Sequence, residues 1–141
     1  MNSSLLAFRL RVSRSGRITA DDVKALQREV LRDGVASREE ADLLLALDRS
    51  ARRVDPRFTD WLVAALVDFV VWGERPTGHV NEQMARWLAS WLTQAPNATS
   101  RRLAREIMRE AQDVDAALLA GVAGEAPDST VVRDGGLRLA A

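Results

Sequence analysis

The chain lacks cysteine and tyrosine entirely and has a single histidine, His79, among its 141 residues. Without cysteine it can form no disulfide, cysteine-ligated zinc site, iron–sulfur cluster or thiol nucleophile. One imidazole also excludes any site that needs two histidines from the same chain. No serine lies in a Gly-x-Ser-x-Gly turn, and the glycines form no phosphate-binding loop. We therefore predict a protein that is not an enzyme, with no catalytic residues and no cofactor.

An excess of charge of one sign is also lacking, because 20 Lys and Arg residues balance 20 Asp and Glu residues. A net charge of zero gives no overall field to attract nucleic acid or a membrane surface. The longest apolar run, residues 61–72, contains Asp68 and is shorter than the roughly 20 residues of a membrane-spanning helix. Residues 1–12 carry Arg9 and Arg11 inside their only apolar stretch, unlike a signal peptide. We expect a cytoplasmic protein without membrane insertion.

Helix starts are the clearest local feature that is present. A side-chain oxygen at the residue before a helix accepts a backbone N–H that has no partner within the helix. Ser37 is followed three residues later by Glu40, which is the spacing of a capping box, and Pro56 suits the first position of a helix. The predicted capping residues are Thr19, Ser37, Asp55 and Asn81.

Apolar residues recur at helical spacing after each of these starts and again after residue 99. The pattern predicts helices over 19–32, 37–52, 56–73, 81–94 and 99–120. Residues 4–13 fit a sixth helix, although the alternation over residues 8–12 also fits a short strand. We expect an all-α fold, a compact single-domain bundle of five to six helices over residues 1–120. The Gly, Pro, Asp, Ser and Thr content of residues 121–141 predicts a flexible, disordered C-terminal tail.

The predicted helix 56–73 is apolar around nearly its whole circumference. Such a helix is normally central to its own domain or to a dimer. Asp68 lies on it between Trp61 and Trp72, and burying a carboxylate there costs several kcal/mol unless it is paired. We therefore expect Asp68 to meet a donor, with Arg75, Arg86, His79 or an indole N–H as candidates.

The segment that follows this helix, residues 72–80, gathers the only histidine, an arginine, a proline and two glycines. Loops held between rigid helices often carry binding residues. A purely structural interpretation also stands, with Gly73 ending the helix, Gly78 in a turn and His79 partnering Asp68 or a carbonyl. The partner-binding residues predicted here are Asp68, Trp72, Arg75 and His79.

Arginines suggest nucleic acid as an alternative partner. Arg101, Arg105 and Arg109 share one helix face, and a second set lies near the N-terminus. Glu106 and Asp113 lie four residues after Arg102 and Arg109, which favours ion pairs on a solvated face. Neither set is interleaved with aromatic residues that could stack on bases, which argues against a nucleic-acid partner. The N-terminal set is Arg9, Arg11, Arg14 and Arg17.

The residues around Gly34 resemble part of a calcium-binding loop, but their spacing does not provide the required ligands. With Gly34 at the sixth loop position, Asp33 and Glu40 fall at ligand positions, but Leu31 falls at the third and has no oxygen to donate. We therefore predict no metal site at Asp33 and Glu40.

Residues 33–41, together with the similar start at residues 16–19, resemble tellurite-resistance TerB-like helical proteins over roughly residues 16–92. Residues 55–92 are similar to bacterial proteins in which a Pro-Gly loop joins two aromatic-rich helices. The TerB resemblance implies a cytoplasmic helical module of stress-associated assemblies, with acidic residues near helix starts that hold metal; Asp33 and Glu40 match that pattern.

The function that we expect is a non-enzymatic protein-interaction or scaffold module. Its partner is another protein or a second copy of the chain in a homodimer. Two alternatives stay open: a nucleic-acid-binding regulator that uses the arginine stripes, and a metal-responsive TerB-like sensor.

Overall fold

The computed structural model describes residues 3–73, 77–94 and 96–119 of the chain. The predicted all-α class is confirmed, with a compact fold built mostly from helices. η1 and η2 are π-helical turns that continue α2 and α4 without a break. The predicted tail, residues 121–141, lies outside the described residues. The helices are α1 (Ser3–Ser15), α2 (Ala20–Ala25), η1 (Leu26–Val30), α3 (Arg38–Ser50), α4 (Pro56–Val67), η2 (Asp68–Trp72), α5 (Glu82–Gln94) and α6 (Ala98–Glu110).

The predicted helix starts are confirmed because each capping side chain makes the expected hydrogen bond. Thr19 Oγ1 accepts the N–H of Asp22 at 3.2 Å, and Asp22 Oδ2 accepts the N–H of Thr19 at 2.8 Å. Burial alone would raise the pKa of Asp22, but the hydrogen bonds from Thr19 and Arg11 outweigh it and lower that pKa. Ser37 and Asn81 cap α3 and α5 by accepting the N–H groups of Glu40 and Met84. The predicted capping box at Ser37 is wrong in its second bond, because Glu40 accepts the N–H of Ala36 instead of that of Ser37.

The predicted sixth helix near the N-terminus exists as α1, and the strand interpretation of residues 8–12 is wrong. α1 buries Leu5, Phe8 and Val12 on one face, which is helical spacing rather than alternation. None of the helices in the described ranges is long and apolar enough to cross a membrane.

Two pairs of very short parallel strands join segments that are distant in sequence. β1 (Arg17–Ile18) pairs with β2 (Arg53–Val54), and β3 (His79–Val80) pairs with β4 (Asp113–Val114). In both pairs the first strand follows a glycine with positive φ, Gly16 or Gly78, a conformation that glycine adopts without steric cost. The backbone carbonyl of that glycine accepts N–H groups from the partner segment.

The predicted helix 99–120 is wrong in its second half. α6 ends at Glu110, Ala111 turns the chain into extended conformation, and β4 follows. A new helical segment starts at residue 116, where the Asp115 side chain accepts the N–H of Ala117 at 2.9 Å. The apolar stripe continues across this break, so periodicity alone did not reveal it.

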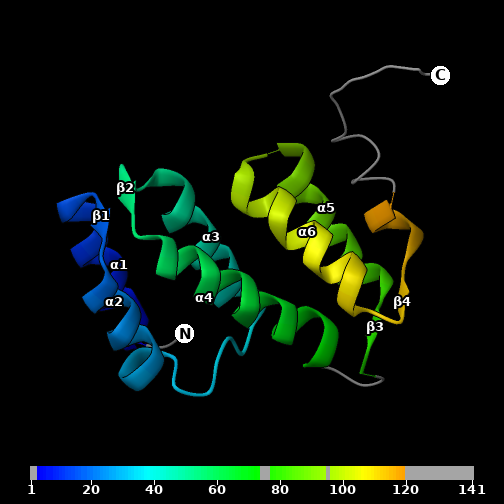
Figure 1. Cartoon of the computed structure of the whole chain (residues 1–141), viewed down its shortest axis with the longest axis horizontal. Coiled ribbons are helices and arrows are strands. Elements are labelled where there is room, and N and C mark those ends of the chain that lie inside the picture. The colour runs from blue at the N-terminus through cyan, green and yellow to red at the C-terminus, as the bar shows by residue number, and fades with distance from the viewer. Residues whose placement is uncertain (1–2, 74–76, 95, 120–141) are drawn as a thin grey trace.

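The strand pairs reveal an internal repeat. A helix, a glycine turn and a short strand lead into a second helix. After a third helix, the partner strand and an aspartate start a fourth helix. This order is seen first from α1 to α4 and again from α4 to the helix at 116–119, so α4 belongs to both units. Figure 1 shows α4 running through the middle of the molecule, with the two strand pairs at opposite ends.

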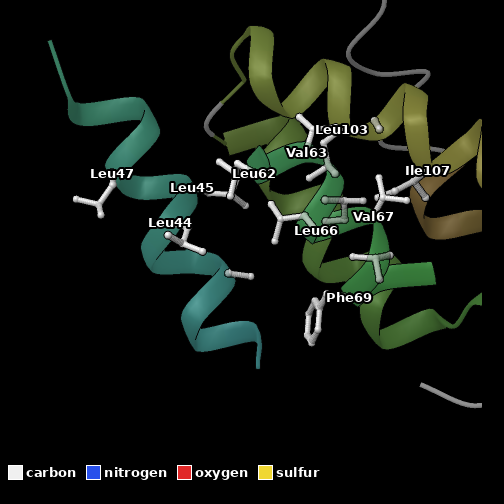
Figure 2. Packing of buried hydrophobic residues seen from close by; sticks show 14 of the residues in the cluster. Leu44, Leu45, Leu47, Leu62, Val63, Leu66, Val67, Phe69, Leu103 and Ile107 are labelled. Carbon is white, nitrogen blue, oxygen red and sulfur yellow. The ribbon is translucent and has the colours of Figure 1, made fainter. Parts of the chain in front are cut away.

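The core forms around α4, as the sequence predicts. α4 packs against α2, α3 and α6. Figure 2 shows Leu44 and Leu45 on the side of α3 that faces Leu62 and Leu66 of α4, while Leu47 points away from α4. Leu103 and Ile107 of α6 lie on the other side of α4. The side chains of these four residues of α4 and α6 are fully buried. The central position of the helix 56–73 is therefore confirmed.

One charged side chain, Asp48, sits half-buried where α3 meets the start of α6. Its Oδ2 accepts a hydrogen bond from the Asn97 amide at 3.5 Å, and the Thr99 side chain also bonds to it. Burial raises the pKa of Asp48, and these two hydrogen bonds offset only part of that rise.

Candidate partner-binding surface

The continuous helix α4–η2 is buried on most sides but leaves one face open. Ala64, Asp68 and Trp72 are exposed, and Trp61 and Ala65 are half-buried. These residues recur every three or four positions and therefore form one stripe along the helix. The remaining large apolar residues of the helix are buried. We call this stripe the open face of α4–η2; its residues are Trp61, Ala64, Ala65, Asp68 and Trp72.

Asp68 is exposed rather than buried, and its candidate donor Arg75 lies outside the described residues, so its pairing stays a prediction. Its side chain is exposed, and it makes no ion pair with any described residue. Of its predicted donors, Arg86 pairs with Glu82 at 2.7 Å and His79 lies 3.7 Å from Asp113. None of the described elements covers Asp68, so solvent reaches its carboxylate, which keeps its hydration.

A groove of about 590 Å³ runs beside the open face. One wall comes from α4–η2, and the other comes from η1 and the residues that follow it. Aliphatic and aromatic side chains line it together with carboxylates and one arginine, so it offers both apolar contact and charge. Its lining includes Leu31, Arg32, Asp33, Trp61, Ala64 and Asp68.

The charge in this groove is mainly negative. Asp33 and Asp68 line it from opposite walls, and Arg32 is the single cation among its lining residues. Neither carboxylate makes an ion pair within the described part of the chain. Sequence reasoning considered Asp33 only as a metal ligand and missed its position opposite Asp68.

The other predicted partner-binding residues lie at the end of the same helix. Trp72 is 41% exposed, although tryptophan is highly buried on average. His79 is exposed in β3, where its Nδ1 lies 3.7 Å from Asp113 Oδ2 rather than near Asp68. Arg75 lies outside the described residues. The structure thus brings Asp68 and Trp72 onto one face, while His79 belongs to the strand pair.

A second polar cluster joins α3 to α5 and was missed by sequence reasoning. Asp42 Oδ1 accepts hydrogen bonds from two indole N–H groups, from Trp87 at 2.7 Å and from Trp91 at 2.8 Å. All three side chains are half-buried. The four-residue spacing of the two tryptophans was the available signal, because it places both indoles on one helix face.

The arginine stripes are partly neutralised by ion pairs. Arg11 pairs with Asp22 and Arg109 pairs with Glu106, each at 2.6 Å. Arg102, which lies outside the stripes, pairs with Asp60 of α4 at 2.8 Å. The predicted i, i+4 partners were therefore wrong in detail: Glu106 pairs three residues away and Asp113 lies in β4 beside His79.

The carboxylate of Glu40 accepts a backbone hydrogen bond at the start of its own helix, α3. Its Oε1 accepts the N–H of Ala36 at 2.9 Å, just before the Ser37 cap. Within residues 3–73, 77–94 and 96–119, no group of three or more metal-ligating side chains is found.

No protein-family model, no curated protein and no solved structure matches the chain. The TerB-like resemblance stays a prediction, and a function has to be inferred from this chain's own residues.

Proposed function

We propose that the protein is a non-enzymatic, cytoplasmic interaction module. In this proposal the groove beside the open face of α4–η2 binds an apolar segment of another protein that carries a basic residue. The single observation that supports it most is that no other described element packs over one face of the central helix. α4–η2 is buried on its other sides, yet Trp61 and Trp72 flank an exposed stripe on it.

The chemistry of the groove favours that kind of partner. Tryptophans dominate binding energy at interfaces because they bury a large rigid surface at little entropic cost. Asp33 and Asp68 face the same groove, and neither makes an ion pair with another residue that the structure describes, so they favour a lysine or arginine in the incoming segment. An amphipathic helix meets both demands, since it presents an apolar stripe bordered by charge.

The test is selection of peptides from a displayed library on the immobilised full chain. We expect amphipathic peptides with a lysine or arginine near their apolar stripe. Asp68→Lys and Trp72→Ala should each weaken binding of the selected peptides by roughly tenfold, which corresponds to about 1.4 kcal/mol. The matched control is Met108→Ala on α6, which removes another exposed apolar side chain and should leave affinity unchanged.

Two results would contradict the proposal. One is selection of peptides whose affinity is the same for wild type, Asp68→Lys and Trp72→Ala. The other is a stable homodimer by light scattering that both variants convert to monomer, because the open face would then be occupied by a second copy of the chain.

A further inference from the structure

The end of the molecule that carries β1 and β2 has an unusual concentration of arginine. The segments 14–18 and 49–54 contain five arginines and no acidic residue. The pairing of β1 with β2 brings these segments together at one end of the molecule (Figure 1). All five side chains are exposed. We call this set the basic end; its residues are Arg14, Arg17, Arg49, Arg52 and Arg53.

Two of these arginines are placed directly opposite each other. Arg17 and Arg53 are partners in the β1–β2 register, and like charges in such positions repel. The equivalent position of the second repeat holds His79 and Asp113, whose side chains lie 3.7 Å apart. The same backbone frame thus accepts a complementary pair, so the backbone does not require two arginines.

Internal contacts leave most of this positive charge unneutralised. Within the described residues, the Arg52 side chain donates one hydrogen bond, from its Nη2 to the Ser15 carbonyl at 3.3 Å. Arg14, Arg17, Arg49 and Arg53 make no ion pair with any described residue. Arg14 and Arg49 lie in the last turns of α1 and α3, where the helix dipole favours a cation. That effect does not account for Arg17 and Arg53.

A groove of about 580 Å³ between α1 and α3 extends this surface. Arg49 belongs to both, and Arg9 lies in the same groove. Ser13 and Ser50 add two hydroxyl groups to its lining. The lining also includes Leu43, Ala46, Leu47, Trp91 and Asp42, whose Oδ1 accepts hydrogen bonds from two indole N–H groups. Guanidinium forks together with hydroxyl donors are the groups that proteins use to bind phosphate oxygens.

We propose that the basic end binds the phosphate backbone of a nucleic-acid duplex. An acidic protein segment fits the β1–β2 pair less well, because protein interfaces depend on apolar anchors. None of the exposed large apolar side chains in the described ranges belongs to β1, β2 or the turns beside them. Neither strand carries an aromatic residue for stacking on bases, so binding is to the backbone and independent of base sequence. The exposed large apolar side chains are Leu6, Leu10, Trp72, Met108 and Leu119.

The experiment measures fluorescence anisotropy of a short labelled DNA duplex titrated with the full chain over a range of salt. If four arginines contact phosphates, the logarithm of affinity falls with that of salt with a slope of about −3.6. Affinity then drops roughly 100-fold between about 50 and about 200 mM salt. Duplexes of different base sequence should bind equally well.

Variants locate the site. Arg17→Gln combined with Arg53→Gln should weaken binding at least roughly tenfold and bring the salt slope about two units closer to zero. The matched control is Arg28→Gln combined with Arg105→Gln, which removes the same charge from η1 and α6 and should change neither value.

A further variant separates binding from folding. Arg53→Glu replaces the repulsive pair by a complementary one, so it should raise Tm while it abolishes duplex binding. A variant that merely misfolded would lose stability instead.

Three results would overturn the proposal. The first is no duplex binding at low salt. The second is an equal loss of duplex affinity in the Arg28→Gln, Arg105→Gln control, which would mean that the α6 stripe or the net charge alone determines binding. The third is equally tight binding of polyglutamate of matched charge, which would indicate an acidic protein partner.

Discussion

Replacing Asp42 by alanine is expected to weaken the link between α3 and α5. The carboxylate accepts the indole N–H groups of Trp87 and Trp91, and alanine leaves both donors without an acceptor. Hydrogen bonds to a charged acceptor contribute about 1.5–3 kcal/mol each when buried. Because these side chains are only half-buried, water reaches the orphaned donors, and we expect a total loss of about 2–3 kcal/mol.

Urea denaturation and thermal unfolding measure this loss. A change of about 2–3 kcal/mol corresponds to a fall in Tm of roughly 6–12 °C for a domain of this size. Asp42→Asn is the control, because it retains a carbonyl oxygen that accepts both N–H groups and should cost about 1 kcal/mol or less. An alanine variant as stable as wild type, with unchanged tryptophan emission, would refute the assigned role of Asp42.

Glycine and pH variants probe other parts of the fold. Gly34→Ala should cost about 1 kcal/mol in urea denaturation for its positive φ alone. Gly78→Ala should cost about 2 kcal/mol, since its added Cβ also lies 3.3 Å from the Gln112 side chain; equal losses would contradict that contact. The lowered pKa of Asp22 means that its stabilisation is present above the unfolded pKa and is lost as pH falls through the folded pKa. Asp22→Asn should therefore flatten the acid side of the Tm–pH curve, and an unchanged acid side would contradict this. The raised pKa of Asp48 means that its protonated carboxyl adds to the free energy of unfolding below the unfolded pKa, and that this stabilisation is lost as pH rises through the folded pKa. Asp48→Asn should raise Tm at about pH 7 but not at about pH 3. A rise in Tm at about pH 3 and none at about pH 7 would contradict the burial of this carboxylate.

Helix starts could be predicted because their causes are local. Thr19, Ser37, Asp55 and Asn81 each accept a backbone N–H two or three residues ahead, so a short stretch of sequence contains the whole interaction. The central place of α4 could also be predicted, because a helix that is apolar on nearly all sides needs neighbours on most of them.

The strand pairs could not be predicted in this way. Each is two residues long and joins segments that are separated by two helices, so no local pattern marks it. The end of α6 was missed for the same reason: residues 111–115 leave the helix to bond with Gly78 and Val80, not because of a local breaker.

Only part of the candidate site could be predicted from the sequence. Asp68 and Trp72 could be singled out as a carboxylate and an indole on an apolar helix. Their exposure depends on which neighbours cover the helix, and that depends on tertiary packing. Asp33 reaches the same groove only because η1 and the loop after it pack beside α4–η2.

The most direct test of the proposed surface uses the four tryptophan indole N–H signals in a proton–nitrogen NMR spectrum. Trp61 and Trp72 lie on the open face, whereas Trp87 and Trp91 bond to Asp42. Titration with a selected amphipathic peptide should shift the signals of Trp61 and Trp72 and leave those of Trp87 and Trp91 in place. Shifts confined to Trp87 and Trp91, or no shift of any indole signal on saturation, would contradict the account.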